Sequence, residues 1–256
     1  MDKETLKRYI KPITDGLFGK YSPYRMKEEH FVVRPISVIV EDLCKIDDEA
    51  WVKYAFSREP LNGKFDDAKR IELAEKATSC GVSICDEYTT KYGVRDPMKL
   101  AKKMNLLVDY PYIPQNTERV LFAEFKKPNK IFVYMDGVNK AERLLNKPGV
   151  KEVVTNRLKI PELLLAHELF HFIEEDQKKE IWTHKFKFDL WGLKFLHNYS
   201  SISVLSEIAA MGFAKELTGI PFSPYVMDAF MVYGYAPEAA SALYEEMMKF
   251  AGLTPH

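Results

Sequence analysis

The sequence predicts an α+β fold in which a small, antiparallel-type sheet packs on helices, and three stretches of the chain carry this prediction. Residues 66–92 repeat apolar side chains three and four positions apart, which is typical of a helix. Residues 106–135 contain short runs rich in β-branched, aromatic and other apolar residues, bounded by Pro, Asn and Gly, which is typical of strands. From residue 161 onward the pattern is helical again. A group of strands between helices indicates the α+β class, here with further helices at both ends.

The composition narrows the class of protein. The chain has 256 residues, of which 46% are hydrophobic, enough for the core of one elaborated domain or two small ones. Its 37 basic and 37 acidic side chains leave no net charge, so we expect neither nucleic acid nor a membrane surface as its partner. No apolar run is long enough to cross a bilayer, and three cysteines are too few for a disulfide framework. A cytoplasmic protein is therefore expected, and its oligomeric state stays open.

Two helices are expected before the strands. The first covers residues 66–92 and ends at Gly93. Its apolar stripe is predicted to consist of Ile71, Ala74, Thr78, Val82 and Cys85. The second covers residues 96–104, where Asp96 suits the N-cap and Pro97 takes the favoured first helical position.

Three strands are expected next. They are predicted over residues 106–110, 120–125 and 131–135. The turn-forming residues 126–130 join the last two as a hairpin. We expect the dipeptide Asp136-Gly137 to end the third strand, because Asp-Gly is a strong turn signal.

The helix predicted over residues 161–176 carries a His-Glu-x-x-His motif formed by His167, Glu168 and His171. Pro161 suits its first turn, and no helix breaker interrupts it. Residues four apart stand one above the other on a helix, so both imidazoles can bind one tetrahedral metal ion. Glu168 lies about 100° further round, near enough to act as a general base on a metal-bound water. This is the geometry of metal-assisted hydrolysis.

The alternative for this motif is a pair of buried, hydrogen-bonded histidines beside an exposed glutamate. We favour the metal site, because two histidines and a glutamate in so apolar a helix are costly to bury without partners. The metzincin pattern is absent, since Glu174 and Gln177 stand where that class has Gly and His. Glu175, like Glu174, lies on the same helix, and eight residues beyond His167 correspond to about 12 Å, too far for one ion. The third ligand is therefore expected from another helix.

Glu207 is the candidate for this third ligand. It lies in a helix predicted over residues 203–217, which Ser203 can cap. Ala210 and Ala214 share its stripe, and such small side chains would let the helix approach the histidine-bearing helix closely. The alternative is an ordinary surface glutamate above an alanine-lined contact.

From about residue 96 to about residue 221, the order of motifs resembles the ImmA/IrrE family of gluzincin-like zinc metallopeptidases. The similarity begins with a helix that starts at Asp96-Pro97 and leads into a strand, followed by a hairpin and the His-Glu-x-x-His helix. It ends with a helix reading Glu207-x-x-Ala210-x-x-Phe213-Ala214-x-x-Leu217, which is similar to the helix of the third zinc ligand in that family. The resemblance covers about half of the chain.

The resemblance implies a minimal zincin-like domain with Zn²⁺ bound by His167, His171 and Glu207. It implies a zinc-dependent metallopeptidase that hydrolyses peptide bonds of a protein or peptide substrate, with Glu168 as general base on a zinc-bound water and a regulatory protein as one candidate substrate. The substrate is expected to pair as an added strand with the hairpin between residues 120 and 135. The alternative function is a non-catalytic regulatory or protein-binding domain that keeps the zincin fold.

The expected metallopeptidase domain covers residues 66–221. It leaves an N-terminal extension of uncertain structure, residues 1–65, and a C-terminal helical segment, residues 222–256, packed on the domain. No helix-turn-helix pattern is recognisable in the extension, which argues against a DNA-binding module. The long interval 172–206 contains an aromatic run at 181–191 that we expect to pack on the core, with the wall of a substrate groove as the alternative. The donor for an oxyanion stays open among His184, His197, Tyr199, Tyr225 and Tyr233.

Overall fold

The computed structural model describes residues 32–115, 120–154, 158–193 and 196–256. The α-helices in this part of the chain are α2 (Ile36–Cys44), α3 (Ala50–Phe56), α4 (Asp67–Tyr92), α5 (Pro97–Lys103), α6 (Met135–Leu145), α7 (Ile160–Asp176), α8 (Trp182–Lys185), α9 (Ser203–Thr218), α10 (Val226–Tyr233) and α11 (Pro237–Phe250). A short 3₁₀ helix, η1, spans Asn62–Lys64. The strands are β1 (Leu107–Asp109), β2 (Ala123–Lys126), β3 (Lys130–Val133), β4 (Phe188–Leu193) and β5 (Leu196–Ser200). The predicted α+β class is confirmed.

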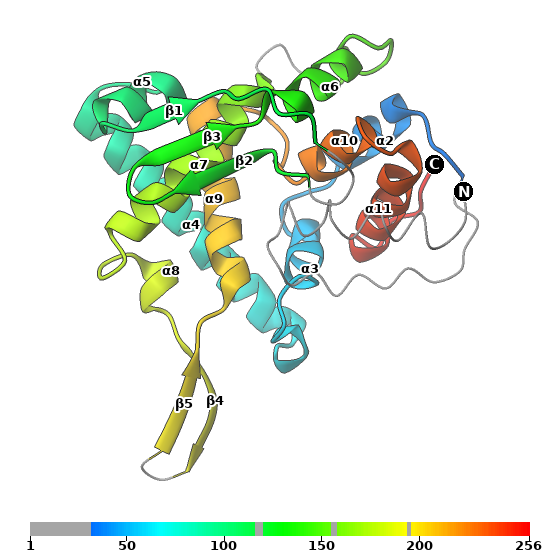
Figure 1. The fold of residues 1–256 in the computed structure, drawn as a ribbon. Helices are drawn as coiled ribbons and strands as arrows, with labels where there is room; N and C mark the ends of the chain where they lie inside the picture. The colour runs from blue at the N-terminus through cyan, green and yellow to red at the C-terminus, as the bar shows by residue number, and fades with distance from the viewer. Residues whose placement is uncertain (1–31, 116–119, 155–157, 194–195) are drawn as a thin grey trace.

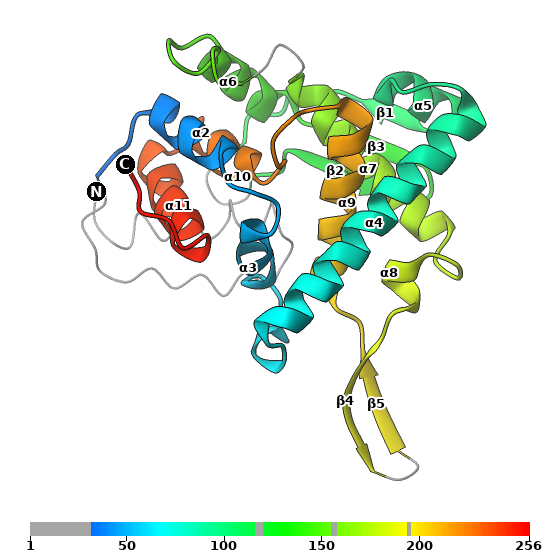
Figure 2. The same cartoon turned by 180° about the vertical axis from the view of Figure 1, so that it is seen from behind.

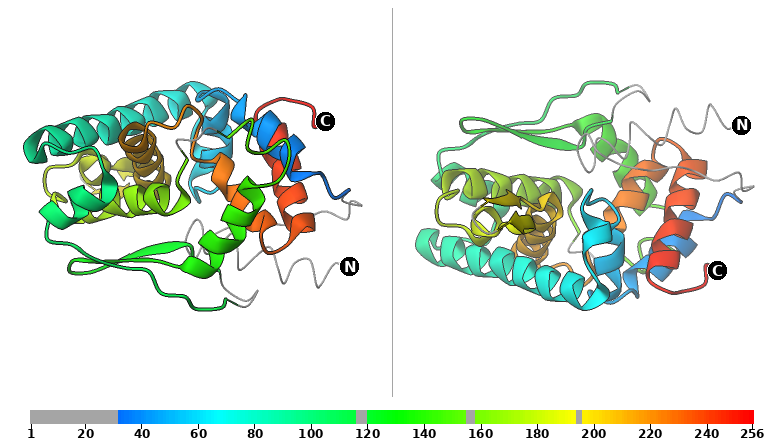
Figure 3. Two further views of the ribbon diagram at one scale, coloured as in Figure 1. Left: turned by 90° about the horizontal axis from the view of Figure 1, so that it is seen from above. Right: turned by 90° about the horizontal axis from the view of Figure 1, so that it is seen from below.

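The three-stranded sheet, α7, α9 and α4 are stacked in this order (Figure 1). One side of α7 contacts β2 and β3, and the other side packs on α9. From behind, α4 is seen on the near side of α9, which it crosses diagonally (Figure 2). From above, the sheet and α4 lie on opposite sides of the α7–α9 pair (Figure 3). The two helices that carry the predicted metal ligands therefore lie in the middle of the fold.

The sheet is mixed, so the prediction of an antiparallel-type sheet is wrong for one of its two strand pairs. β2 and β3 form the predicted antiparallel hairpin, but β1 runs parallel to β3, with Val108 opposite Ile131. The strand order is β1-β3-β2, so β3 lies between β1 and β2. An apolar pattern predicts which face of a strand is buried, but it does not fix the direction of a short strand. Within the described residues, β2 is an edge strand of this sheet.

The ends of α4 agree with the prediction, whereas its buried stripe is shifted. Asp66 caps the helix by accepting the backbone N–H of Lys69 at 2.8 Å, and Gly93 ends it with a left-handed φ of 66°. Thr78 is exposed and Val82 only half-buried, although both were expected in the stripe. The positions that are buried are Leu73, Ala74, Ala77, Gly81, Ile84, Cys85, Tyr88 and Thr89. This stripe faces α9, which the sequence of α4 alone does not locate.

The contact between α4 and α9 leaves no room for a side chain at Gly81. A Cβ atom there would lie 2.0 Å from the backbone oxygen of Ala209. We expect Gly81→Ala to push α9 away and to lower the free energy of unfolding by about 1–3 kcal/mol or more, measured by urea denaturation. Gly63→Ala is the control, because a Cβ atom at that residue meets nothing within 4 Å. Equal stability of the two variants would contradict this close helix contact.

The first turn of α9 is stabilised by Glu59 and not by the predicted cap, Ser203. Ile202 is the N-cap, and Ser203 is the first helical residue. The Ser203 hydroxyl and the Val204 N–H both donate to Glu59 Oε2, at 3.0 and 3.1 Å. A carboxylate at the positive end of the helix dipole is favourable. The cap therefore comes from a residue 144 positions away in sequence, which no local pattern can indicate.

The dipeptide Asp136-Gly137 does not end a strand in a turn, as predicted, but lies in the first turn of α6. Asp136 Oδ2 accepts hydrogen bonds from Lys140 Nζ and from the Tyr235 hydroxyl, both at 2.8 Å. An acidic residue in the first helical turn also interacts well with the helix dipole. These contacts outweigh the tendency of Asp-Gly to form a turn.

Both ends of the described chain form one helical cluster, in which α2 and α3 pack with α10 and α11 (Figure 1). Residues 1–31 of the N-terminal extension lie outside the described residues. In the aromatic run, Trp182 and Phe186 stack with ring centroids 5.3 Å apart, whereas the β4–β5 hairpin projects away from the body of the molecule. No helix in the described part of the chain combines the length and apolar character needed to span a bilayer.

Candidate metal centre

His167 and His171 lie one turn apart on α7, and Glu207 faces them from α9. The two Nε2 atoms are 3.0 Å apart. Glu207 Oε2 lies 3.3 Å from His167 Nε2, and Glu207 Oε1 lies 3.6 Å from His171 Nε2. Within the described residues, these three form the one group of His, Cys, Asp or Glu side chains whose ligand atoms converge in this way. The structure thus brings the predicted ligands together.

The spacing of these atoms fits a tetrahedral metal ion. Zinc bonds nitrogen and oxygen at about 2.0–2.1 Å, so two ligands at tetrahedral angles lie about 3.3 Å apart. The three observed separations, 3.0, 3.3 and 3.6 Å, scatter around this value. The side chains of His167, His171 and Glu207 are 18%, 20% and 30% exposed, which leaves solvent a route to a fourth position. The donor set therefore suits a catalytic zinc site with one open corner.

The electrostatics of the site favour a cation between its carboxylates. Burial lowers the pKa of His171, but the negative charges of Glu207, Glu174 and Glu168 outweigh burial and hold it well above its usual value. Burial raises the pKa of Glu207, but the two histidines outweigh burial and hold it well below its usual value. Negative charges that stabilise a protonated imidazole in this way also favour a metal cation between these side chains.

Glu174 supports His171 from the side opposite Glu207. Its Oε2 atom lies 3.5 Å from His171 Nδ1 and accepts a hydrogen bond from the Ser206 hydroxyl at 2.5 Å. The Thr183 hydroxyl donates to its other oxygen, also at 2.5 Å, and Glu174 is only 6% exposed. A carboxylate at one ring nitrogen fixes the imidazole so that the other nitrogen can bind a metal. Glu174 lies three residues after His171, and on a helix this spacing brings two side chains together, which is the sequence signal for the supporting role. This role was not predicted.

We expect Glu174→Gln to weaken zinc binding by about 10–100-fold, because the neutral amide no longer holds His171 as a carboxylate does. Competition with a chromophoric chelator measures this affinity. The control is Glu175→Gln at the next position, where the half-buried carboxylate pairs with Lys127 and Lys178 at 2.9 Å. Equal zinc affinity of both variants would rule out the supporting role of Glu174.

Glu168 lies beside the three converging side chains and faces the edge of the sheet. Its Oε2 atom accepts the backbone N–H of Phe125, in β2, at 2.7 Å. The rings of Phe125 and Phe172 meet edge to face, 5.6 Å apart, and so hold β2 against α7. A cavity of about 80 Å³ opens next to His167 and Glu168. The predicted base is thus at the boundary between the metal centre, a cavity and a free strand edge.

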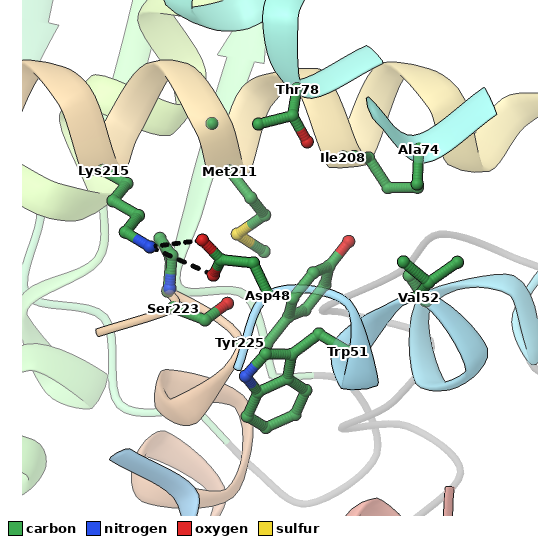
Figure 4. Close-up of a pocket in the computed structure, with 13 residues that line it drawn as sticks. Asp48, Trp51, Val52, Ala74, Thr78, Ile208, Met211, Lys215, Ser223 and Tyr225 are labelled. Carbon is green, nitrogen blue, oxygen red and sulfur yellow. Dashed lines mark hydrogen bonds and ion pairs between the residues drawn. The ribbon is translucent and has the colours of Figure 1, made fainter. Parts of the chain in front are cut away.

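Among the candidate oxyanion donors whose side chains are described, Tyr225 is the one on which the charge of Glu207 acts. Tyr199 is 58% exposed on the projecting hairpin, and His184 lies on α8. Tyr233 ends α10, and the side chain of His197 lies outside the described part of the chain. Tyr225 is buried and lines a separate cavity, drawn in Figure 4. Burial, together with the charges of Asp228 and Glu207, raises the pKa of Tyr225, and its hydroxyl has no hydrogen-bond partner within the described residues. Of the five, Tyr225 is therefore the candidate that the structure links to Glu207.

Two histidines, a carboxylate that faces them and a further carboxylate beside them are the residue types of metal-assisted hydrolysis. Comparisons with protein-family models, with curated proteins and with solved structures find no match for this chain. The function of the site therefore rests on its own chemistry and geometry.

Proposed function

We propose that this protein is a zinc-dependent metallopeptidase in which His167, His171 and Glu207 hold the zinc ion and Glu168 is the general base. The observation that carries the proposal is the convergence of three ligand atoms from two helices, with a second carboxylate, that of Glu168, next to them. The order of motifs that resembles the ImmA/IrrE family supports the same function. So does the position of α7 between a small sheet and α9, which suits a zincin-like arrangement.

The side chains of the site have different roles in the proposed hydrolysis. Zinc, when bound, polarises the scissile carbonyl and lowers the pKa of water. Glu168 takes a proton from the attacking water and passes it to the leaving amine. Glu174 holds the His171 ring in place, with Ser206 and Thr183 as its hydrogen-bond donors.

The free edge of β2 is the proposed place for the substrate backbone. Tyr134 N–H donates to Phe122 O at 2.9 Å, and bonds to β3 recur at every second residue of an antiparallel pair. Ala123 and Phe125 therefore direct their backbone groups away from β3. The hydrogen bond from Phe125 N–H to Glu168 agrees with this alternation. A substrate carbonyl that accepted this N–H would pair with the edge and at the same time release Glu168.

The proposed substrate is a protein or peptide, and the proposed compartment is the cytoplasm. An extended chain is the substrate that an edge strand recognises. Cys44, Cys80 and Cys85 are all unpaired, and burial raises the pKa of each thiol. Unpaired cysteines of this kind suit a reducing environment.

The hydrogen bond between Glu168 and Phe125 favours one second candidate. A carboxylate occupied by the protein backbone is not available as a base, so the same fold can serve as a non-catalytic, protein-binding regulator. In that case zinc, if bound, would be structural.

The two functions are separated by adding zinc to the purified protein and incubating it with urea-unfolded casein. The peptidase is expected to bind one zinc ion per chain and to cut casein, and a zinc chelator is expected to stop the reaction. New peptides are detected by mass spectrometry. Stoichiometric zinc without any cut, over a range of substrate proteins, would favour the regulator.

A further inference from the structure

The cavity beside His167 and Glu168 is mostly apolar. It lies between β2, α7, α9 and α10, and has a volume of about 80 Å³. The side chains of its apolar wall include Leu163, Leu164, Met211, Met227 and Met231. Part of its wall is thus built by α10, which follows the stretch that resembles a known family. The cavity is continuous with the candidate site, because His167 and Glu168 themselves form part of its wall.

The two carboxylates on this wall, those of Glu168 and Asp228, are already used by the protein, and Glu168 accepts the backbone N–H of Phe125. Asp228 is 3% exposed, and its Oδ2 atom accepts a hydrogen bond from the Tyr54 hydroxyl at 2.8 Å. The guanidinium of the buried Arg58 lies 5.0 Å from the centre of the Tyr54 ring and places positive charge behind this pair. Burial raises the pKa of Asp228 to about 7, although Tyr54 and Arg58 oppose the shift. The cavity therefore does not demand a cationic guest.

A second cavity on the other side of Met211 differs in both lining and position. Figure 4 shows Met211 pointing into it from α9 and the ion pair between Asp48 and Lys215 at its border. Its volume is about 60 Å³, and none of the four candidate site residues lines it. Of these two cavities, the one next to Glu168 is therefore the one that can receive part of a chain bound at the candidate site.

We propose that the cavity next to Glu168 is a specificity pocket for the large apolar side chain, Leu, Met or Phe, of a residue that flanks the scissile bond. Ala123 of β2 also lines it, so a strand paired with the β2 edge has its side chains within reach of the opening. Flexible methionines suit a pocket that accepts several apolar shapes. The apolar guest displaces water from the methionine-lined wall, which favours binding.

This inference rests on the proposed peptidase activity, and its test starts from the zinc-loaded full chain. Cuts in unfolded casein are first mapped by mass spectrometry. Peptides are then compared in which the residue flanking a mapped cut is Ala, Leu, Met, Phe or Lys. We expect kcat/KM to be at least about tenfold higher for Leu, Met or Phe than for Ala or Lys, as apolar pockets discriminate between side chains by such factors.

Two variants test the pocket itself. Met231→Ala enlarges it and is expected to shift the preference towards Trp by about tenfold or more. Met248→Ala is the control, since Met248 is equally buried, in α11, but does not line the cavity.

Ala123→Leu narrows the opening from a half-buried strand position, and is expected to lower cleavage of the Phe peptide while sparing the Ala peptide. It tests the pocket even where Met231→Ala fails to fold.

The outcomes separate the pocket from the peptidase. If zinc-loaded wild-type protein cuts nothing, both the proposed peptidase function and the proposed specificity pocket are refuted. If it cuts without apolar preference, or if Ala123→Leu leaves the preference unchanged, only the pocket is refuted. A preference for Lys also refutes it and assigns specificity to Asp228.

Discussion

Replacement of Glu168 by Gln is expected to leave zinc binding intact and to lower kcat for peptide hydrolysis by about 10²–10⁴-fold. Glu168 is not among the three converging ligands, so its loss does not disturb them. The amide oxygen of Gln can still accept the Phe125 N–H, which keeps β2 in place. A neutral amide, however, cannot take a proton from water. The measurement is kcat on a peptide that the wild-type protein cuts, together with zinc content by elemental analysis.

The matched control for this experiment is Glu162→Gln. Glu162 lies on the same helix, in its first turn, and pairs with Lys159 at the surface at 2.8 Å. Its replacement is expected to change neither zinc content nor kcat. If Glu168→Gln keeps its zinc and hydrolyses the peptide as fast as the wild type, Glu168 is not the base. The biological role of the site would then be regulatory.

Replacement of Glu207 by Ala is expected to have the largest effect on the metal centre. It removes one of three ligands, which should cost more than the 10–100-fold that loss of a supporting partner such as Glu174 costs. We therefore expect the affinity for zinc to fall by more than about 100-fold, or about 2.7 kcal/mol. Hydrolysis should disappear with the metal. Titration with zinc in the presence of a competing chelator measures the loss.

Glu216→Ala is the control for Glu207→Ala, because Glu216 lies on the same helix and pairs with Arg95 at the surface at 2.9 Å. This variant is expected to bind zinc like the wild type. Equally tight zinc in both variants would show that the third ligand is another residue. The fold of each variant is checked by its unfolding curve, since Glu207 also holds two histidines together.

Local signals predicted the helices well because they act over a few residues. Asp66 and Asp96 each accept a backbone N–H three residues on, and Gly93 ends α4 in the left-handed conformation. Pro161 lies in the first turn of α7. Caps of this kind are set by the backbone groups that a helix end leaves unpaired, so the sequence alone shows them.

Contacts between distant residues escaped prediction. The cap of α9 comes from Glu59, and β1 pairs in parallel with β3, a strand that begins 21 residues after β1 ends. The buried stripe of α4 depends on where α9 packs, at Gly81. Tertiary packing decides each of these features. An apolar pattern predicts which face of a helix or strand is buried, but not which other element packs against that face.

In the candidate site, too, the sequence predicts what depends on local spacing, but not the contacts between distant residues. The helical spacing of His167 and His171 could be derived from the sequence, and Glu207 was inferred from its alanine-lined helix and a family resemblance. The contact of Glu168 with Phe125 N–H could not be foreseen, because it is made by a backbone group of a strand 43 residues earlier. Glu174 was considered only as a ligand, although its spacing also allows it to support His171.

The central claim is tested most directly by a crystal structure of the zinc-loaded protein with anomalous data at the zinc absorption edge. We expect one strong peak within about 2.0–2.2 Å of His167 Nε2, His171 Nε2 and an oxygen of Glu207, with Glu168 outside bonding distance. A peak that Glu207 does not contact, or zinc bound at another place on the chain, would contradict the account.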